Sequence, residues 1–198
     1  MKAFDPKEFF RRNVSTNFHD SSFSVIAPII HEDQELQQKM RSAINGKRII
    51  ELGCCDLVRY CLDLFAMGAG SYAGVDPYHI PDISAVRKWF MEMGFDKMKD
   101  KKIEYYQRDA LSYLQSLPSS DGIMTFSSGT LEGDIIHDEK YARQVVQQIA
   151  RLSRPKETTA IHVVDPFFAG LFQEEGLHLD FGKRASNGFT LGLYSKTV

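Results

Sequence analysis

The feature that most constrains the fold is a regular alternation of short apolar runs with amphipathic helical patterns. Five apolar runs of strand length, each followed by a helical pattern, lie at 48–52, 72–75, 103–108, 122–126 and 159–164. Two parallel strands need a crossover that returns the chain to the same edge of the sheet, and that crossover is usually a helix. The alternation therefore predicts an α/β fold, a three-layer Rossmann-like sandwich with a mostly parallel sheet.

The helical patterns are recognised by apolar residues at three- and four-residue steps. Helices are expected to begin at about 33, 56, 83, 110, 138 and 167. Asp138 has a side chain suited to cap the longest of them. The inward face of that helix is expected at Tyr141, Val145, Ile149 and Leu152.

After the fifth strand the pattern changes to two apolar runs, 177–183 and 189–196, joined by a short polar segment. Asn187 and Gly188 in that segment favour a tight hairpin turn. The sequence thus predicts a seven-stranded sheet that ends in an antiparallel hairpin, which a dinucleotide-binding domain has no reason to contain. We expect one compact domain, with residues 47–198 as its α/β part and 1–46 as an N-terminal helical cap segment.

Composition excludes several classes of protein. A formal net charge of −2 over 198 residues gives no reason to expect nucleic acid or an anionic membrane as a partner. Cys54, Cys55 and Cys61 lack the paired spacing of a zinc site and do not form a disulfide framework, so no metal site is predicted. Neither a signal peptide nor a membrane span is expected, and a cytoplasmic location is predicted.

Polar residues lie where the first four predicted strands end, and an open parallel sheet binds ligands at that edge. The first strand contains Glu51 before Gly53, the second ends at Asp76, the third leads to Asp109 and the fourth to Ser127. In this order and spacing, residues 47–196 resemble the class I S-adenosylmethionine-dependent methyltransferases. The resemblance implies a transferase that binds S-adenosylmethionine and releases S-adenosylhomocysteine.

The resemblance also implies which residues contact the cofactor: Glu51, Gly53, Cys54, Cys55, Asp76, Pro77, Tyr78, Asp109, Ala110 and Ser127. In such a site Asp76 would accept hydrogen bonds from the ribose hydroxyls, Tyr78 would stack on adenine and Asp109 would receive the adenine amine. Each has a simpler explanation as well. Asp76 can cap its own loop, Asp109 can cap a helix, Tyr78 can pack against the protein, and adjacent cysteines can be small buried side chains.

Methyl transfer mainly requires alignment of the acceptor with the methyl group, and a base helps when the acceptor is a poor nucleophile. Candidates for that base follow the fourth and fifth strands: Ser127, Ser128, Glu132, His137 and Asp165. By contrast, His162 lies in the middle of the fifth strand and is expected to be buried structure. A small molecule is the predicted acceptor, because the chain has neither an inserted substrate domain nor a basic groove.

Two other interpretations stay open. Cys55 and Leu57 stand at positions where the family has glycine, so the chain could be an inactive, methyltransferase-like binding module. A nicotinamide-dependent oxidoreductase would need the G-x-G-x-x-G turn, of which only the first glycine is present. That second alternative also lacks a Tyr-x-x-x-Lys pair, because Tyr141 is followed by Val145.

Overall fold

The computed structural model describes residues 33–54, 60–92, 100–119, 123–127, 138–164, 169–184 and 190–197. Its strands are β1 (Arg48–Leu52), β2 (Ser71–Val75), β3 (Lys102–Tyr106), β4 (Met124–Ser127), β5 (Thr158–Val164), β6 (Leu177–Arg184) and β7 (Thr190–Lys196). Its helices are α3 (Gln34–Ile44), α4 (Cys61–Ala66), α5 (Ile83–Glu92), α6 (Ala110–Gln115), α7 (Glu139–Leu152) and α8 (Ala169–Glu174). None of the helices in these ranges has the length and apolar character that a membrane span needs.

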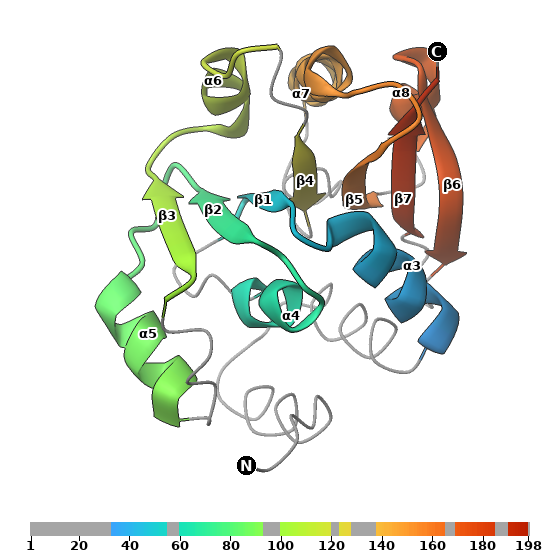
Figure 1. The fold of residues 1–198 in the computed structure, drawn as a ribbon. Coiled ribbons are helices and arrows are strands. Elements are labelled where there is room, and N and C mark those ends of the chain that lie inside the picture. Colours follow the sequence, from blue (N-terminus) through green and yellow to red (C-terminus); the bar gives the residue numbers. More distant parts are fainter. Residues whose placement is uncertain are drawn as a thin grey trace.

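The strands form one seven-stranded sheet in the order β3-β2-β1-β4-β5-β7-β6, which Figure 1 shows nearly edge-on. Strands β1 to β5 pair in parallel, whereas β7 lies antiparallel to both β5 and β6. The prediction of a mostly parallel seven-stranded sheet that ends in an antiparallel hairpin is confirmed. The predicted turn at Asn187 and Gly188 lies outside the described residues.

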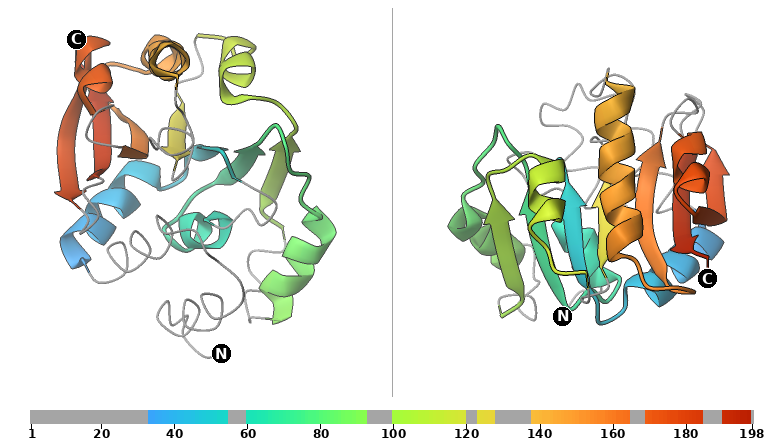
Figure 2. Two further views of the ribbon diagram at one scale, coloured as in Figure 1. Left: turned by 180° about the vertical axis from the view of Figure 1, so that it is seen from behind. Right: turned by 90° about the horizontal axis from the view of Figure 1, so that it is seen from above.

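Helices cover both faces of the sheet. In Figures 1 and 2, α3, α4 and α5 lie on one side, and α6, α7 and α8 lie on the other. Successive residues of a strand point to opposite faces, so Ile49 belongs to the hydrophobic cluster with α3 and α4, while Ile50 belongs to the cluster with α6, α7 and α8. Burial on both faces explains why β1, β2 and β4 are mostly apolar, whereas the edge strand β3 is only partly buried.

The longest helix, α7, is built as its sequence predicts. The Asp138 side chain caps it by accepting hydrogen bonds from the backbone N–H groups of Lys140 (2.9 Å) and Tyr141 (3.2 Å). Of the predicted inward face, Val145, Ile149 and Leu152 are buried and Tyr141 is partly buried. The predicted core contacts of this helix are therefore confirmed.

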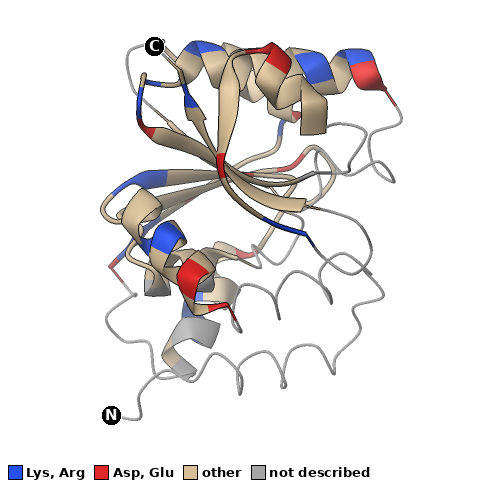
Figure 3. Ribbon diagram, turned by 90° about the vertical axis from the view of Figure 1, so that its right-hand side faces the viewer, with Lys and Arg blue, Asp and Glu red and all other residues tan. Residues whose placement is uncertain are grey.

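Helix α3 precedes the sheet in sequence but packs into its core. Leu36 and Met40 are buried in the cluster that includes Ile49. Asp33 caps the helix by accepting from the Leu36 N–H at 2.9 Å, and it also pairs with Lys183 of β6 at 2.9 Å. The helix is thus fixed beneath the β6–β7 hairpin (Figure 3). Positively and negatively charged segments are interspersed over the elements visible in that view.

Element ends differ from the sequence predictions by a few residues. The third strand ends at Tyr106, not at Arg108, because the Arg108 N–H donates to the Tyr106 carbonyl at 2.9 Å and closes a turn. Helix α6 ends before Leu117, because Ser116 takes the C-cap position. The fourth strand runs on to Ser127. The described part of the helix expected from residue 56 begins at Cys61, and residues 55–59 lie outside the described ranges.

Candidate functional site

The carboxyl ends of β2, β1 and β4 lie side by side and bring predicted site residues to one edge of the sheet. Glu51 in β1 lies opposite Gly74 of β2 and Phe126 of β4. Asp76 directly follows β2, and Ser127 is the last residue of β4. Burial leaves Glu51, Asp76 and Ser127 at most 4% exposed. Three polar side chains are therefore held within the protein at the edge where this type of sheet binds ligands.

The turn after β1 depends on Gly53. Its φ of 74° lies in the left-handed region that favours glycine. The Gly53 N–H donates to the Val75 carbonyl at 2.8 Å, so the turn bends against β2. The conformation by itself explains the glycine, and it also leaves the backbone at this point without a side chain.

Cys54 points into the protein. It is 1% exposed, and a Cβ atom added to Gly74 would lie 2.7 Å from its Sγ. The thiol thus fills the space that Gly74 leaves on β2, which agrees with the interpretation of Cys54 as a small buried side chain. Cys55 and Leu57, where the family has glycine, lie outside the described residues.

The carboxylate of Glu51 binds a buried phenol. The Tyr72 hydroxyl donates to Glu51 Oε2 at 2.5 Å, and Tyr72 has no exposed surface. Burial, and then the negative charge of Glu51, raise the pKa of Tyr72 well above its ordinary value. The phenol therefore keeps its proton at any ordinary pH. Its hydrogen bond fixes the orientation of the Glu51 carboxylate inside the protein.

Asp76 caps the loop that follows it, as one interpretation of the sequence predicts. Its Oδ1 accepts from the backbone N–H groups of Tyr78 (2.9 Å) and His79 (3.0 Å), and His79 Nδ1 lies 3.0 Å from the same oxygen. The main chain of Asp76 is held by β3, since its N–H donates to the Tyr106 carbonyl at 3.2 Å and its carbonyl accepts from the Tyr105 hydroxyl at 2.9 Å. The position of this carboxylate is therefore well defined.

The loop after Asp76 exposes large apolar side chains. Tyr78 is 86% exposed and Ile80 is 68% exposed. The interpretation of Tyr78 as a packing residue is wrong, because its ring lies almost entirely outside the protein. The ring of Tyr78 is thus exposed in the loop that the buried carboxylate of Asp76 caps.

Asp109 is the N-cap of α6. Its Oδ1 accepts from the Ser112 N–H at 2.9 Å and lies 3.5 Å from the Tyr141 hydroxyl. Burial alone would raise the pKa of Asp109, but hydrogen bonds from Ser112 and from neighbouring backbone groups outweigh it and lower the pKa. Ala110 follows as the first helical residue, and its side chain packs in the core. The capping interpretation thus accounts for Asp109 within the described residues.

Of the candidate bases, the structure describes only Ser127, which is fully buried opposite His162 of β5. Ser128, Glu132, His137 and Asp165 lie outside the described residues. His162 is structural, as expected. Its Nε2 lies 2.8 Å from Oγ1 of Thr125, its ring packs edge-on against Phe172, and burial lowers its pKa to about 3.

Sequence reasoning missed three residues that organise this edge: Tyr72, His79 and Tyr105. The alternation along β2 places Tyr72 on the same face as Gly74, and therefore as Glu51, once the strands are paired. The i+3 spacing of His79 from Asp76 is typical of a turn closed by an aspartate side chain. No comparable signal pointed to Tyr105, whose role depends on the pairing of β2 with β3.

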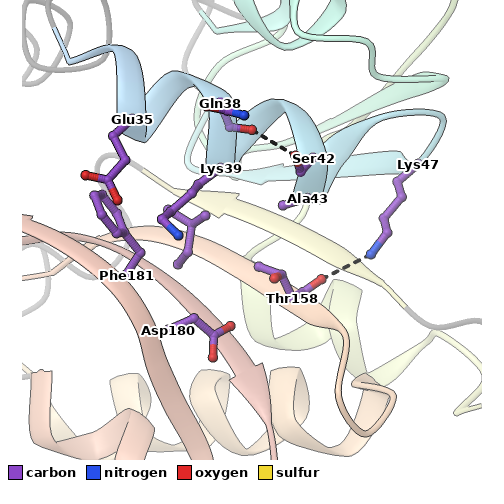
Figure 4. A pocket seen from close by; sticks show the side chains of 10 residues that line it. Glu35, Gln38, Lys39, Ser42, Ala43, Lys47, Thr158, Asp180 and Phe181 are labelled. Carbon is purple, nitrogen blue, oxygen red and sulfur yellow. Dashed lines mark hydrogen bonds between the residues drawn. The ribbon is translucent and has the colours of Figure 1, made fainter.

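A separate pocket of about 570 Å³ lies on the α3 face, between α3 and strands β5, β6 and β7 (Figure 4). Its charged lining consists of Glu35, Asp180, Lys39 and Lys47. Lys47 Nζ donates to the Thr158 carbonyl at 3.2 Å, and Lys39 Nζ lies 5.2 Å from the centre of the Phe181 ring. Acids and bases balance in this pocket, so it favours neither sign of ligand charge.

Comparisons with known proteins place this geometry in a structural class. No family model and no curated protein matches the sequence. Among solved structures, one match is a Listeria monocytogenes protein assigned as an S-adenosylmethionine-dependent methyltransferase, with a TM-score of 0.55 and 11% identity over 87% of this chain and 100% of that one.

Two further matches have similar values. A ribosomal protein L11 methylase from Lactobacillus delbrueckii subsp. bulgaricus gives a TM-score of 0.55 and 14% identity over 84% of this chain and 79% of that one. A Streptococcus pneumoniae protein assigned as a tRNA (m1A22) methyltransferase was solved with S-adenosyl-L-methionine. It gives a TM-score of 0.52 and 14% identity over 83% of this chain and 74% of that one. With its strand order and closing hairpin, the chain has the fold of the class I S-adenosylmethionine-dependent methyltransferases.

Proposed function

We propose that this protein is an S-adenosylmethionine-dependent methyltransferase that acts by in-line transfer to a small-molecule acceptor. The observation that carries the proposal is the buried carboxylate of Asp76 at the end of β2, in a sheet with the methyltransferase strand order. Glu51 of β1, Gly53 in the turn after β1 and Ser127 of β4 lie at the same edge of the sheet.

The described residues fit the cofactor. Asp76 offers a carboxylate to vicinal hydroxyls, and Tyr78 offers an exposed ring beside it. Gly53 leaves the turn after β1 open to a close backbone contact, and Cys54 does not obstruct it because its side chain points inward. Bound S-adenosylmethionine would supply a methyl group already activated by positive sulfur. The task of the chain is then to hold and orient the two reactants.

The acceptor class is supported by the sequence alone. The fold does not narrow it, because unrelated substrates are used by proteins of one fold. The solved structures named above include a ribosomal protein L11 methylase and a protein assigned to tRNA methylation. Short connections between the strands and the absence of a basic groove in the sequence favour a small molecule.

A second candidate is a methyltransferase-like module that binds the ligand without transferring a methyl group. Cys55 and Leu57 at glycine positions support it, and so does the complete burial of Ser127. A fully buried hydroxyl is not placed to take a proton from an acceptor that binds outside the core.

Calorimetry with S-adenosylmethionine, S-adenosylhomocysteine and NAD separates these functions. Binding of both adenosyl ligands, followed by transfer of a labelled methyl group to a metabolite extract, is the expected result. Binding without transfer to metabolite, protein or tRNA pools would favour the module. If neither adenosyl ligand binds at millimolar concentration, the methyltransferase proposal is wrong, and binding of NAD instead would indicate an oxidoreductase.

A further inference from the structure

The loop after β2 has one histidine whose ring returns to the strand end. His79 Nδ1 lies 3.0 Å from Asp76 Oδ1, and the side chains are 47% and 6% exposed, respectively. The contact therefore joins a half-exposed imidazole to a nearly buried carboxylate. That carboxylate belongs to Asp76, on which the proposed ligand binding depends.

The contact with Asp76 determines which tautomer a neutral His79 ring adopts. A carboxylate oxygen can only accept, so the proton of a neutral His79 ring must be on Nδ1. Nε2 is then left as the acceptor of the ring. A hydrogen bond to an ionised acceptor is stronger than one between neutral groups.

Three donors converge on one oxygen of Asp76. They are the Tyr78 N–H, the His79 N–H and the His79 ring, at 2.9 to 3.0 Å. A carboxylate oxygen has two lone pairs, so Oδ1 has no capacity for a further donor. Oδ1 is therefore committed to the loop.

From this geometry we infer that His79 is a positioning residue for the adenosyl site and acts through Asp76. The inference rests on the function proposed above. Together with the two loop amides, the ring holds Oδ1 on the loop and so fixes the orientation of the carboxylate. Because His79 lies between Tyr78 and Ile80, the same hydrogen bond holds the loop in the form that exposes both apolar side chains.

Two variants separate the hydrogen bond from the bulk of the ring. In His79→Asn the side-chain amide nitrogen can occupy the place of Nδ1, whereas His79→Leu has a similar size without a donor. We expect His79→Leu to weaken S-adenosylhomocysteine binding by about fivefold to twentyfold, and His79→Asn to stay within about twofold of the unmodified protein.

The matched control is His178→Leu, because His178 is another exposed histidine with one side-chain contact, Nε2 to Thr197 Oγ1 at 3.0 Å. It should leave affinity unchanged. Equal affinities in both His79 variants and the unmodified protein would overturn the inference. Equal losses of affinity in His79→Leu and His79→Asn would also overturn the inference, because the His79 ring would then act by contacting the ligand directly.

A measurement without ligand distinguishes failure of this inference from failure of the proposed function. Nitrogen NMR of the free protein should show the Nδ1–H tautomer of His79, and the Tyr78 and His79 amides should be protected from hydrogen exchange. Protection should fall in His79→Leu and persist in His79→Asn. The Nε2–H tautomer, or unchanged protection in His79→Leu, would overturn the inference whether or not any adenosyl ligand binds.

Discussion

The hydroxyl of Tyr72 donates a hydrogen bond of 2.5 Å to Glu51 Oε2, and both side chains are almost completely buried. The pair connects the second strand to the first directly beneath the turn at Gly53. Burying a carboxylate costs free energy unless hydrogen-bond donors compensate the charge. The Tyr72 hydroxyl supplies such a donor and thereby makes a buried Glu51 possible.

Tyr72→Phe should therefore lower the free energy of unfolding by about 1–3 kcal/mol, because it leaves a buried carboxylate oxygen without this donor. Urea denaturation measures the change. Tyr194→Phe is the matched control, since Tyr194 is also buried but its hydroxyl has no hydrogen bond within the described residues. A loss of similar size in the control would mean that the Glu51 contact is not the cause.

Asp76→Ala should weaken the binding of S-adenosylhomocysteine at least tenfold, about 1.4 kcal/mol, because the proposed ribose contact loses its acceptor. Asp76→Asn keeps an oxygen for the loop amides and tests the charge separately. Asp82 is the control: it caps Ser84 and Ala85 at α5 in a similar way, so Asp82→Asn should leave affinity unchanged. Unchanged affinity in Asp76→Ala would show that Asp76 only caps its loop.

Gly74→Ala should destabilise the protein by about 1–3 kcal/mol, because its new Cβ has no room beside another side chain. The nearest atom is Cys54 Sγ, at 2.7 Å from the added carbon. Removing that sulfur in the double variant with Cys54→Ala should recover part of the loss, a coupling that a double-mutant cycle measures in urea. Strictly additive losses would contradict the contact.

His162 should make the protein less stable in acid. Burial lowers its pKa to about 3 in the folded protein, against an ordinary value of 6.5. Between these values the unfolded chain binds a proton that the folded protein does not, so stability is greatest above pH 6.5 and falls as the pH drops toward 3. The contribution of this one group is about 2 kcal/mol between pH 6.5 and pH 5.

His162→Gln removes this titration, so its unfolding free energy should depend less steeply on pH than that of the unmodified protein. Urea denaturation at several pH values between 5 and 7 gives the two slopes. His178→Gln, which replaces a histidine at an exposed position on β6, is the control. Identical slopes in all three proteins would show that His162 does not cause the acid sensitivity.

The sheet could be predicted because the information is local. Continuous apolar runs, helical spacing in α7 and the cap at Asp138 each depend on neighbours in sequence. The ends of elements were less accurate, because they depend on single backbone hydrogen bonds such as the one from Arg108 to Tyr106.

In the candidate site, too, features that depend on nearby residues could be predicted, and features that depend on strand pairing could not. Asp76 and Gly53 were found from their places after strands. The hydrogen bond from Tyr72 to Glu51 could not be predicted, because it depends on the strand register that pairs Glu51 with Gly74. The exposure of Tyr78 could not be read from the sequence either, since it results from the loop that Asp76 holds.

The position of β7 between β5 and β6 has a consequence for how the protein is made. β6 is synthesised before the strand that joins it to the sheet, and it has no contact with β5 in the strand order. Until residues 190–196 leave the ribosome, β6 is without a strand partner and the edge of β5 is open. This part of the sheet must therefore form last, when the β6–β7 hairpin closes and β7 pairs with the open edge of β5.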